Sequence, residues 1–138
     1  MLLFAGLLLL GVSAISASAQ DSMMKEDHMM KMDPKNPTVA VIRADWCPYC
    51  KQLEPTMMDL MSEYSGKINF VMLDVTNKET TAKAAATAKS LGLTSFFEAN
   101  KKKTSTVGIF KNKKLLFKTT NNQDRSAYVA AFDKAIKG

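Results

Sequence analysis

A strand, a helix and a second strand follow one another closely in the middle of the chain, and this order limits the possible folds most. Val39 to Ala44 is a short apolar run rich in β-branched residues, which is typical of a strand. Pro48 to Tyr64 carries apolar residues at helical spacing, and its initial proline suits a first helical turn. Lys67 to Val75 is apolar on both faces, as in a central strand covered on both sides. This order implies two parallel strands joined by a right-handed crossover.

The remainder of the chain adds two helices and a hairpin. The alanine-rich segment Glu79 to Leu91 is predicted to be helical, and Asn122 to Lys137 carries the apolar stripe of a last helix. Ser105 to Phe110 and Lys114 to Thr119 are the predicted strands of a β-hairpin, with Asn112 as the turn residue that accepts a positive φ. The expected α/β fold has the order β-α-β-α-β-β-α, with a mixed four-stranded sheet and helices on both of its faces.

Residues 1–19 are predicted to be a signal peptide. An apolar run from Leu2 to Val12 is too short to span a bilayer comfortably, and small residues follow it up to the cleavage signature Ala17-Ser18-Ala19. No Lys or Arg precedes the apolar run, so an uncleaved anchor is the alternative. We therefore expect a periplasmic or secreted protein that has no membrane span after cleavage.

Residues 20–37 are predicted to be a flexible tether before a folded domain at residues 38–138. The tether contains no β-branched or aromatic residue and has two prolines near its end. Thioether and imidazole groups suit copper, and the tether's Met/His cluster is similar to segments of periplasmic copper-resistance proteins. A plain linker or a sacrificial target of oxidants is the alternative reading of this cluster. The cluster consists of Met23, Met24, His28, Met29, Met30 and Met32.

The chain is basic, with nineteen Lys and Arg against thirteen Asp and Glu and a formal charge of +6. This balance does not indicate nucleic-acid binding, because the lysines are spread along the chain. The one run, Lys101-Lys102-Lys103, has no interleaved aromatic residue on which a base could stack. We read that run as a solvated loop. The 138 residues suit one domain, and we expect a monomer.

Cys47 and Cys50, the two cysteines of the chain, lie at the junction of the first predicted strand and helix. There a thiolate meets the positive end of the helix dipole and unpaired backbone N–H groups, which can lower a cysteine pKa to roughly 3.5–7.5. The Cys47 thiolate could then attack a partner disulfide, and Cys50 would resolve the mixed disulfide. Two alternatives are weaker. A structural disulfide would close a very short loop, and a zinc site needs about four ligands.

From Thr38 to Gly138 the chain resembles the thioredoxin superfamily, and we expect an exported bacterial member. The Cys-Pro-Tyr-Cys tetrad is similar to that of glutaredoxins, whereas Trp46 and Lys51 around it resemble thioredoxin. The resemblance implies that Cys47 is an exposed nucleophile, that Cys50 is a buried resolving cysteine and that Trp46 is a platform beside the site. Further matching features are Pro55, Glu63-Tyr64, Gly66-Lys67, Asp74 and Phe110-Lys111-Asn112.

Three departures from the family concern the site and its surroundings. The extra strand and helix with which thioredoxins begin have no counterpart in the short polar tether. Val41 stands where the family has a buried Asp that assists the resolving cysteine. Ser105, followed by Thr106, stands at the family's cis-proline, and a cis bond before serine would cost about 2.5–4 kcal/mol, so we expect a trans bond. The segment Leu93 to Lys103 has no clear secondary-structure pattern, and Thr94 to Lys103 is inserted just before this position, where it could cover the site or determine the choice of partner.

These observations favour an exported thiol–disulfide oxidoreductase that acts on protein disulfides or dithiols, more in the reducing than in the oxidising direction. Its partners would be protein substrates and a redox donor or acceptor protein, and its redox centre would be the disulfide, without another cofactor. Trp46, Pro48, Tyr49, Ser105 and Thr106 are the predicted substrate-binding residues. The alternatives are a copper-binding or copper-delivery protein that uses the tether with the cysteine pair, and a non-catalytic binding module.

Overall fold

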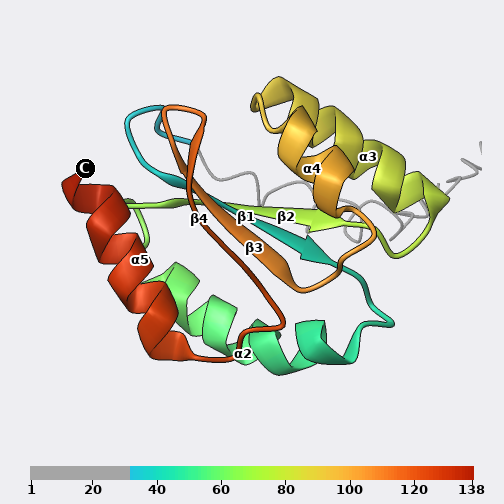
Figure 1. Ribbon diagram of the computed structural model, residues 1–138, viewed down its shortest axis with the longest axis horizontal. Coiled ribbons are helices and arrows are strands. Elements are labelled where there is room, and N and C mark those ends of the chain that lie inside the picture. Colours follow the sequence, from blue (N-terminus) through green and yellow to red (C-terminus); the bar gives the residue numbers. More distant parts are fainter. Residues whose placement is uncertain (1–31) are drawn as a thin grey trace, which may run out of the picture.

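A mixed four-stranded sheet in the order β2-β1-β3-β4 forms the centre of the protein in the computed structural model, which describes residues 32–138 (Figure 1). Strands β1 and β2 are parallel, and β3 is antiparallel to both β1 and β4. The predicted thioredoxin-like α/β fold is confirmed. Along the chain the elements are β1 (Thr38–Arg43), α2 (Pro48–Glu63), β2 (Asn69–Asp74), α3 (Lys78–Ser90), α4 (Thr94–Asn100), β3 (Thr106–Lys111), β4 (Lys114–Thr120) and α5 (Arg125–Lys137).

Helices cover both faces of the sheet, α2 and α5 one face and α3 and α4 the other (Figure 1). The alternation of side chains along β1 divides the core accordingly: Val39 and Val41 join one buried cluster, and Ala40 and Ile42 join the second. On the first face, Phe132 of α5 makes edge-on ring contacts with Tyr64 and Phe70. None of the helices within residues 32–138 is long and apolar enough to cross a membrane.

Helix α4 is an element that the sequence pattern did not reveal. Its seven residues begin directly after α3 and bury Phe96, Phe97 and Asn100 against the sheet. The Asn100 side-chain amide donates to the Phe96 carbonyl of the same helix over 2.7 Å, so this buried side chain has a hydrogen-bond partner. The segment is too short to show a helical period, and its lysines follow the helix rather than interrupt it.

The prediction that β2 is a central strand is wrong. In the described part of the chain β2 lies at one edge of the sheet and pairs with β1 alone. Its two faces are apolar because helices cover the sheet on both sides: Val71 and Leu73 pack in the cluster of α3 and α4, and Phe70 packs against the cluster of α2 and α5. Met72 remains 39% exposed. A pattern of apolar residues reports which faces are covered, and it does not report how many strands are neighbours.

The hairpin of β3 and β4 turns at Asn112 and Lys113, which both have positive φ, 51° and 64°. The prediction for Asn112 is confirmed, and Lys113 shares the conformation because a two-residue turn of this hand needs positive φ at both positions. A bulge between Ile109 and Phe110 shifts the register, so that Leu115 pairs with Phe110. The bulge and the flanking lysines mark β4 as a protected edge strand.

Gly108 in the middle of β3 is expected to tolerate no side chain. A Cβ atom there would lie 2.6 Å from Phe96 Cε2 and 2.9 Å from Phe110 Cε2. We expect Gly108→Ala to lower the free energy of unfolding by about 1–3 kcal/mol, the usual cost of overpacking. Urea denaturation measures this loss, and it should be smaller when the same change is made in a Phe96→Leu background. An equal loss in both backgrounds would show that the contact with Phe96 is not the cause.

Candidate active site

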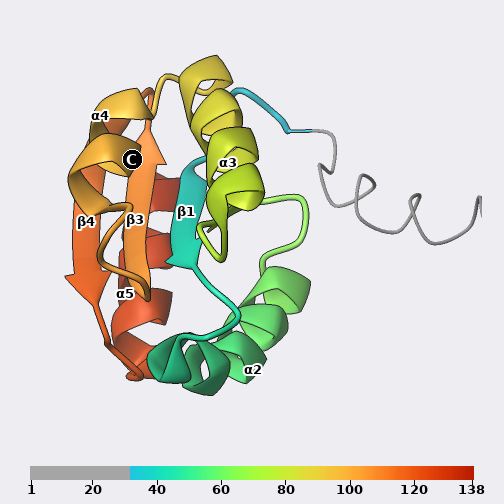
Figure 2. The same ribbon diagram turned by 90° about the vertical axis from the view of Figure 1, so that its right-hand side faces the viewer.

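Cys47 and Cys50 form a disulfide at the start of α2, where the loop after β1 enters the helix (Figure 2). Cys47 is the N-cap residue, and its Sγ atom accepts the backbone N–H of Cys50 over 3.2 Å. Pro48 occupies the first turn, where its missing N–H costs no hydrogen bond. The strand thus delivers Cys47 to the positive end of a helix dipole, as the sequence predicted.

The two cysteines are both buried in this disulfide state, Cys47 at 2% exposure and Cys50 at 8%. The expectation that Cys47 is the exposed one of the pair is therefore wrong for the oxidised protein. As the N-cap, Cys47 turns its sulfur toward the Cys50 N–H, and both cysteines join the buried cluster that includes Ile42 and Ala44. The exposed groups here are Trp46, 61% exposed, and Tyr49, 49% exposed. An incoming partner therefore meets an aromatic surface before it meets sulfur.

Trp46 and Asp45 are fixed by Thr76, which follows β2 and which the sequence did not single out. The Trp46 indole donates to the Thr76 carbonyl over 3.0 Å. The Asp45 N–H donates to the Thr76 hydroxyl over 2.9 Å. Although the Trp46 ring is exposed, these bonds hold its orientation beside the disulfide, as a platform requires. The contact joins residues about thirty positions apart, so no local pattern could have indicated it.

Arg43, at the end of β1, holds two carboxylates next to this platform. Its guanidinium donates to Asp45 over 2.6 Å and to Asp74, its neighbour on β2, over 2.5 Å. Burial alone would lower the pKa of Arg43, but the hydrogen bond to Asp45 and the charges of both carboxylates raise it. Burial alone would raise the pKa of Asp74, but hydrogen bonds from Thr76 and the charge of Arg43 outweigh it and lower the pKa. The network ties both strands to the loop that carries the cysteines.

The lowered pKa of Asp74 gives the protein a pH-dependent stability. Because the folded-state pKa lies below the ordinary value of 3.8, the contribution of Asp74 is fully present above that pH. It is lost as the pH falls through the folded-state pKa. We expect Asp74→Asn to be less stable than the wild type near pH 7, and the difference to shrink at about pH 2.5. Urea denaturation at both pH values measures this, and a difference that stays constant with pH would contradict it.

Val41 is buried on the face of β1 that carries α2, and its partner across the parallel ladder is Met72. Neither residue ionises, so the position where the family resemblance places an Asp provides no proton acceptor here. The nearest ionisable pair on these two strands is Arg43 with Asp74, two residues further along each strand.

Ser105 and Thr106 lie at the start of β3 and are both completely buried. The peptide bond before Ser105 is trans, as expected, but Ser105 has a φ of 62°, which the sequence did not indicate. Its N–H donates to the Ile42 carbonyl of β1 over 2.8 Å, and its carbonyl accepts the Asn121 N–H over 3.0 Å. The Thr106 hydroxyl bonds to the Lys103 carbonyl and to Thr120. Both side chains are thus turned away from solvent.

Gln123, in the loop between β4 and α5, is a site residue that the sequence reasoning missed. Its side-chain amide donates to the Tyr49 carbonyl, between the two cysteines, over 3.3 Å. The loop is anchored because the Tyr128 hydroxyl donates to the Asn122 carbonyl over 2.7 Å. Burial of that tyrosine raises its pKa to about 12, so the hydroxyl remains a donor near neutral pH. The contact joins residues 74 positions apart, and glutamine carries no motif that could have indicated it.

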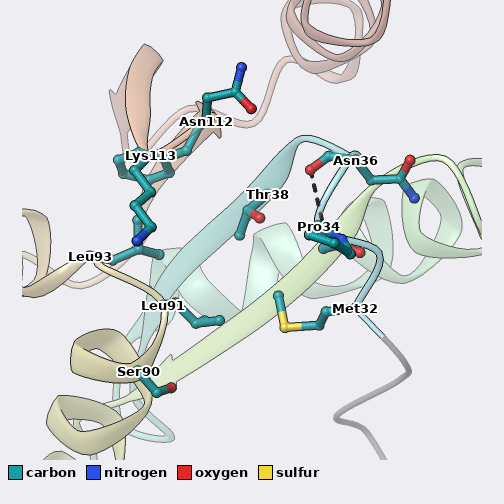
Figure 3. A pocket seen from close by; sticks show the side chains of 11 residues that line it. Met32, Pro34, Asn36, Thr38, Ser90, Leu91, Leu93, Asn112 and Lys113 are labelled. Atoms are coloured by element: carbon teal, nitrogen blue, oxygen red, sulfur yellow. Dashed lines mark hydrogen bonds between the residues drawn. The ribbon is translucent and has the colours of Figure 1, made fainter.

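Within residues 32–138 no group of three or more His, Cys, Asp and Glu side chains could hold a metal ion. Five of the six members of the Met/His cluster lie outside the described residues, as does the predicted signal peptide, so both remain predictions from the sequence. Met32, the sixth, lines a pocket of about 570 Å³ together with Pro34, Leu91 and Leu93 (Figure 3). This pocket lies at the start of β1, by Thr38. The disulfide follows the other end of that strand.

Comparisons with known proteins agree with this geometry. The family model of thioredoxin matches residues 20–122 of the chain. Thioredoxin C-2 of Corynebacterium nephridii is 39% identical over 51 residues, which are 37% of this chain and 47% of that protein. The chloroplastic thioredoxin-like protein HCF164 of Arabidopsis thaliana is 46% identical over 41 residues, which are 30% of this chain and 16% of that protein. The matched part thus spans less than half the length of either relative.

The fold also matches solved structures. The thioredoxin of Malassezia sympodialis superimposes with a TM-score of 0.52 at 20% identity, over 74% of this chain and 79% of that structure. At this identity the match concerns the fold alone. It agrees with the mixed sheet covered by helices on both faces.

Proposed function

The chain belongs to the thioredoxin family, and from this premise we propose that it is a thiol–disulfide oxidoreductase acting on protein disulfides. The observation that carries the proposal is the Cys47–Cys50 disulfide at the N-terminus of α2, where Cys47 Sγ already accepts a backbone N–H. A helix N-terminus and such a donor favour the thiolate over the thiol, and the thiolate is the form that attacks disulfides.

In the reduced protein the Cys47 thiolate attacks one sulfur of a substrate disulfide. A mixed disulfide forms, and the second substrate sulfur leaves as a thiolate that takes up a proton. Cys50, one helical turn away, then loses its proton and attacks Cys47 Sγ, and the first substrate sulfur leaves as a thiolate that takes up a proton. The Cys47–Cys50 disulfide forms again, and two electrons have passed to the substrate. A donor dithiol reduces the pair for the next cycle.

Substrate docking is proposed to involve the exposed rings of Trp46 and Tyr49 and the neighbouring Pro48. The prediction that Ser105 and Thr106 contact the substrate is not kept, because both residues are completely buried and the Ser105 N–H and carbonyl are already bonded to Ile42 and Asn121. The substrate is proposed to contact only the exposed residues around the cysteines.

We propose net reduction of substrates as the main direction and an exported compartment as its place. The thioredoxin-like Trp46 and Lys51 support this direction, whereas the tetrad itself fits either direction. Export is supported by the apolar run and the Ala17-Ser18-Ala19 signature. Sequencing the N-terminus of the protein recovered from extracytoplasmic fractions tests export. A protein found only in the cytosol with Met1 intact would overturn it.

The activity is tested with the full chain and insulin as a model protein disulfide, with dithiothreitol as electron donor. Precipitation of the freed insulin B chain measures the rate. The proposal expects a clear acceleration over dithiothreitol alone, in proportion to protein concentration. A rate equal to that of dithiothreitol alone would overturn the proposed activity.

A further inference from the structure

Two buried side-chain atoms among residues 32–138 have no hydrogen-bond partner, the Ser105 hydroxyl oxygen and the Gln123 amide oxygen. Buried polar groups are almost always paired, so each exception calls for an explanation. Both residues lie in segments that border the disulfide. Ser105 bonds to the strand that leads to Cys47, and Gln123 bonds to Tyr49, between the two cysteines. Both residues are thus bonded to the chain just before or within the cysteine motif.

The orientation of Gln123 is fixed by its one polar contact. The Tyr49 carbonyl can only accept, so the group that faces it over 3.3 Å must be the amide nitrogen. The amide oxygen, Oε1, consequently points elsewhere and is buried without a donor. A rotation of the amide by half a turn would not help, because it would bring two oxygen atoms together at Tyr49.

The two segments are also joined to each other. The Ser105 carbonyl accepts the N–H of Asn121, which is two residues before Gln123. Ser105 is held at a φ of 62°, a conformation that a serine rarely adopts, with its N–H on the Ile42 carbonyl. Hydrogen bonds thus run from the end of β1 through Ser105 and the β4–α5 loop to Tyr49.

A disulfide offers no hydrogen-bond donor, whereas a dithiol offers S–H groups. Reduction adds two electrons and two protons, breaks the bond between the sulfur atoms and creates two thiols; the reductant, a dithiol, becomes a disulfide. The oxidised protein therefore has two unmatched buried oxygen atoms in segments that are hydrogen-bonded to the chain around a disulfide, and the disulfide itself cannot donate. The reduced protein gains the donors that such oxygen atoms lack, and the Ser105 hydroxyl can in turn donate to a thiolate.

We propose that Gln123 and Ser105 are positioning residues that pair with the cysteine sulfurs in the reduced state alone, and so stabilise the dithiol relative to the disulfide. This inference rests on the proposed function and concerns the potential of the same site. It implies that the wild-type dithiol is a weaker reductant than the dithiol of a variant that lacks these two side chains.

The test is the equilibrium between the full chain and a glutathione buffer series, with the oxidised fraction measured by thiol alkylation. Gln123→Met keeps the length of the side chain without its polar atoms, and Ser105→Ala removes the hydroxyl alone. Each change is expected to increase the ratio of disulfide to dithiol at a fixed buffer composition by roughly two- to tenfold, the effect of one hydrogen bond. Gln52→Met and Ser65→Ala, at exposed positions, are the controls and should leave the ratio unchanged.

Unfolding by urea in each redox state gives a second reading, which also shows that the variants fold. The reduced variants should be less stable than the reduced wild type, whereas the oxidised variants should be as stable as the oxidised wild type or more stable, because an unpaired buried atom is removed. Equal losses in both states, or an unchanged ratio, would overturn the inference. If only one of the two variants changes the ratio of disulfide to dithiol, the inference is overturned for the residue whose variant leaves the ratio unchanged. The insulin assay is separate, so loss of the proposed activity and loss of this inference are distinguishable.

Discussion

Replacing Cys47 by serine is expected to reduce the rate of insulin reduction to that of dithiothreitol alone. The hydroxyl of serine does not ionise near neutral pH at this position, so no nucleophile remains to form the mixed disulfide. The helix N-terminus that favours a thiolate cannot compensate for the missing sulfur. The turbidity assay measures the loss, and a circular dichroism spectrum equal to that of the wild type shows that the fold is retained.

Cys50→Ser is the matched control for the order of the two steps. Cys47 can still attack, but no thiolate resolves the mixed disulfide, so a covalent complex with the substrate should accumulate. Nonreducing electrophoresis detects this complex, and dithiothreitol should separate its two components by reducing the mixed disulfide. If Cys47→Ser trapped the complex and Cys50→Ser did not, the assignment of Cys47 as nucleophile would be reversed.

Phe132→Ala is expected to cost about 3–5 kcal/mol of the free energy of unfolding, the usual result of removing a large aromatic side chain from a core. Phe132 is completely buried on α5, and its ring contacts those of Tyr64, Phe70 and Tyr128, with centroid distances of 5.2, 5.7 and 6.4 Å. The truncation removes these three ring contacts and leaves a cavity in the core. Urea denaturation measures the loss.

Leu116→Ala serves as a comparison, because Leu116 is the extra residue of the β4 bulge and is exposed. Its replacement should change the free energy of unfolding by no more than about 0.5 kcal/mol. Similar losses for the two variants would mean that burial against α5 does not dominate the stability of this face of the sheet.

Most of the fold could be predicted from the sequence because most elements carry their own period. Helix α2 places Leu53, Met57 and Leu60 on its buried face, and strand β1 alternates between the two clusters. The two misses had different causes. Helix α4 has seven residues, too few for a period to appear. The place of β2 at the edge depends on which strands are neighbours, and this is a property of the whole sheet.

The candidate site also contains some residues that could be predicted from the sequence and others that could not. The two cysteines are adjacent in the motif, and the helix that follows them is periodic, so both could be placed from the sequence. Thr76 and Gln123 could not, because each reaches the motif through a backbone carbonyl or hydroxyl contact across many intervening residues. The burial of Cys47 also escaped prediction, because it depends on how the N-cap side chain turns toward the Cys50 N–H.

The two edge strands of the sheet, β4 and β2, differ in how well they are protected against pairing with a further strand. Strand β4 has a bulge and lysines at positions 114 and 118, devices that discourage a further strand from pairing. Strand β2 has neither, and its residues from Asn69 to Leu73 include no charged side chain and no proline. Within residues 32–138, growth of the sheet by a further strand is therefore favoured at β2 over β4. Because β2 pairs with β1 and not with β3, such growth would leave the β4–α5 loop and its contact with Tyr49 undisturbed.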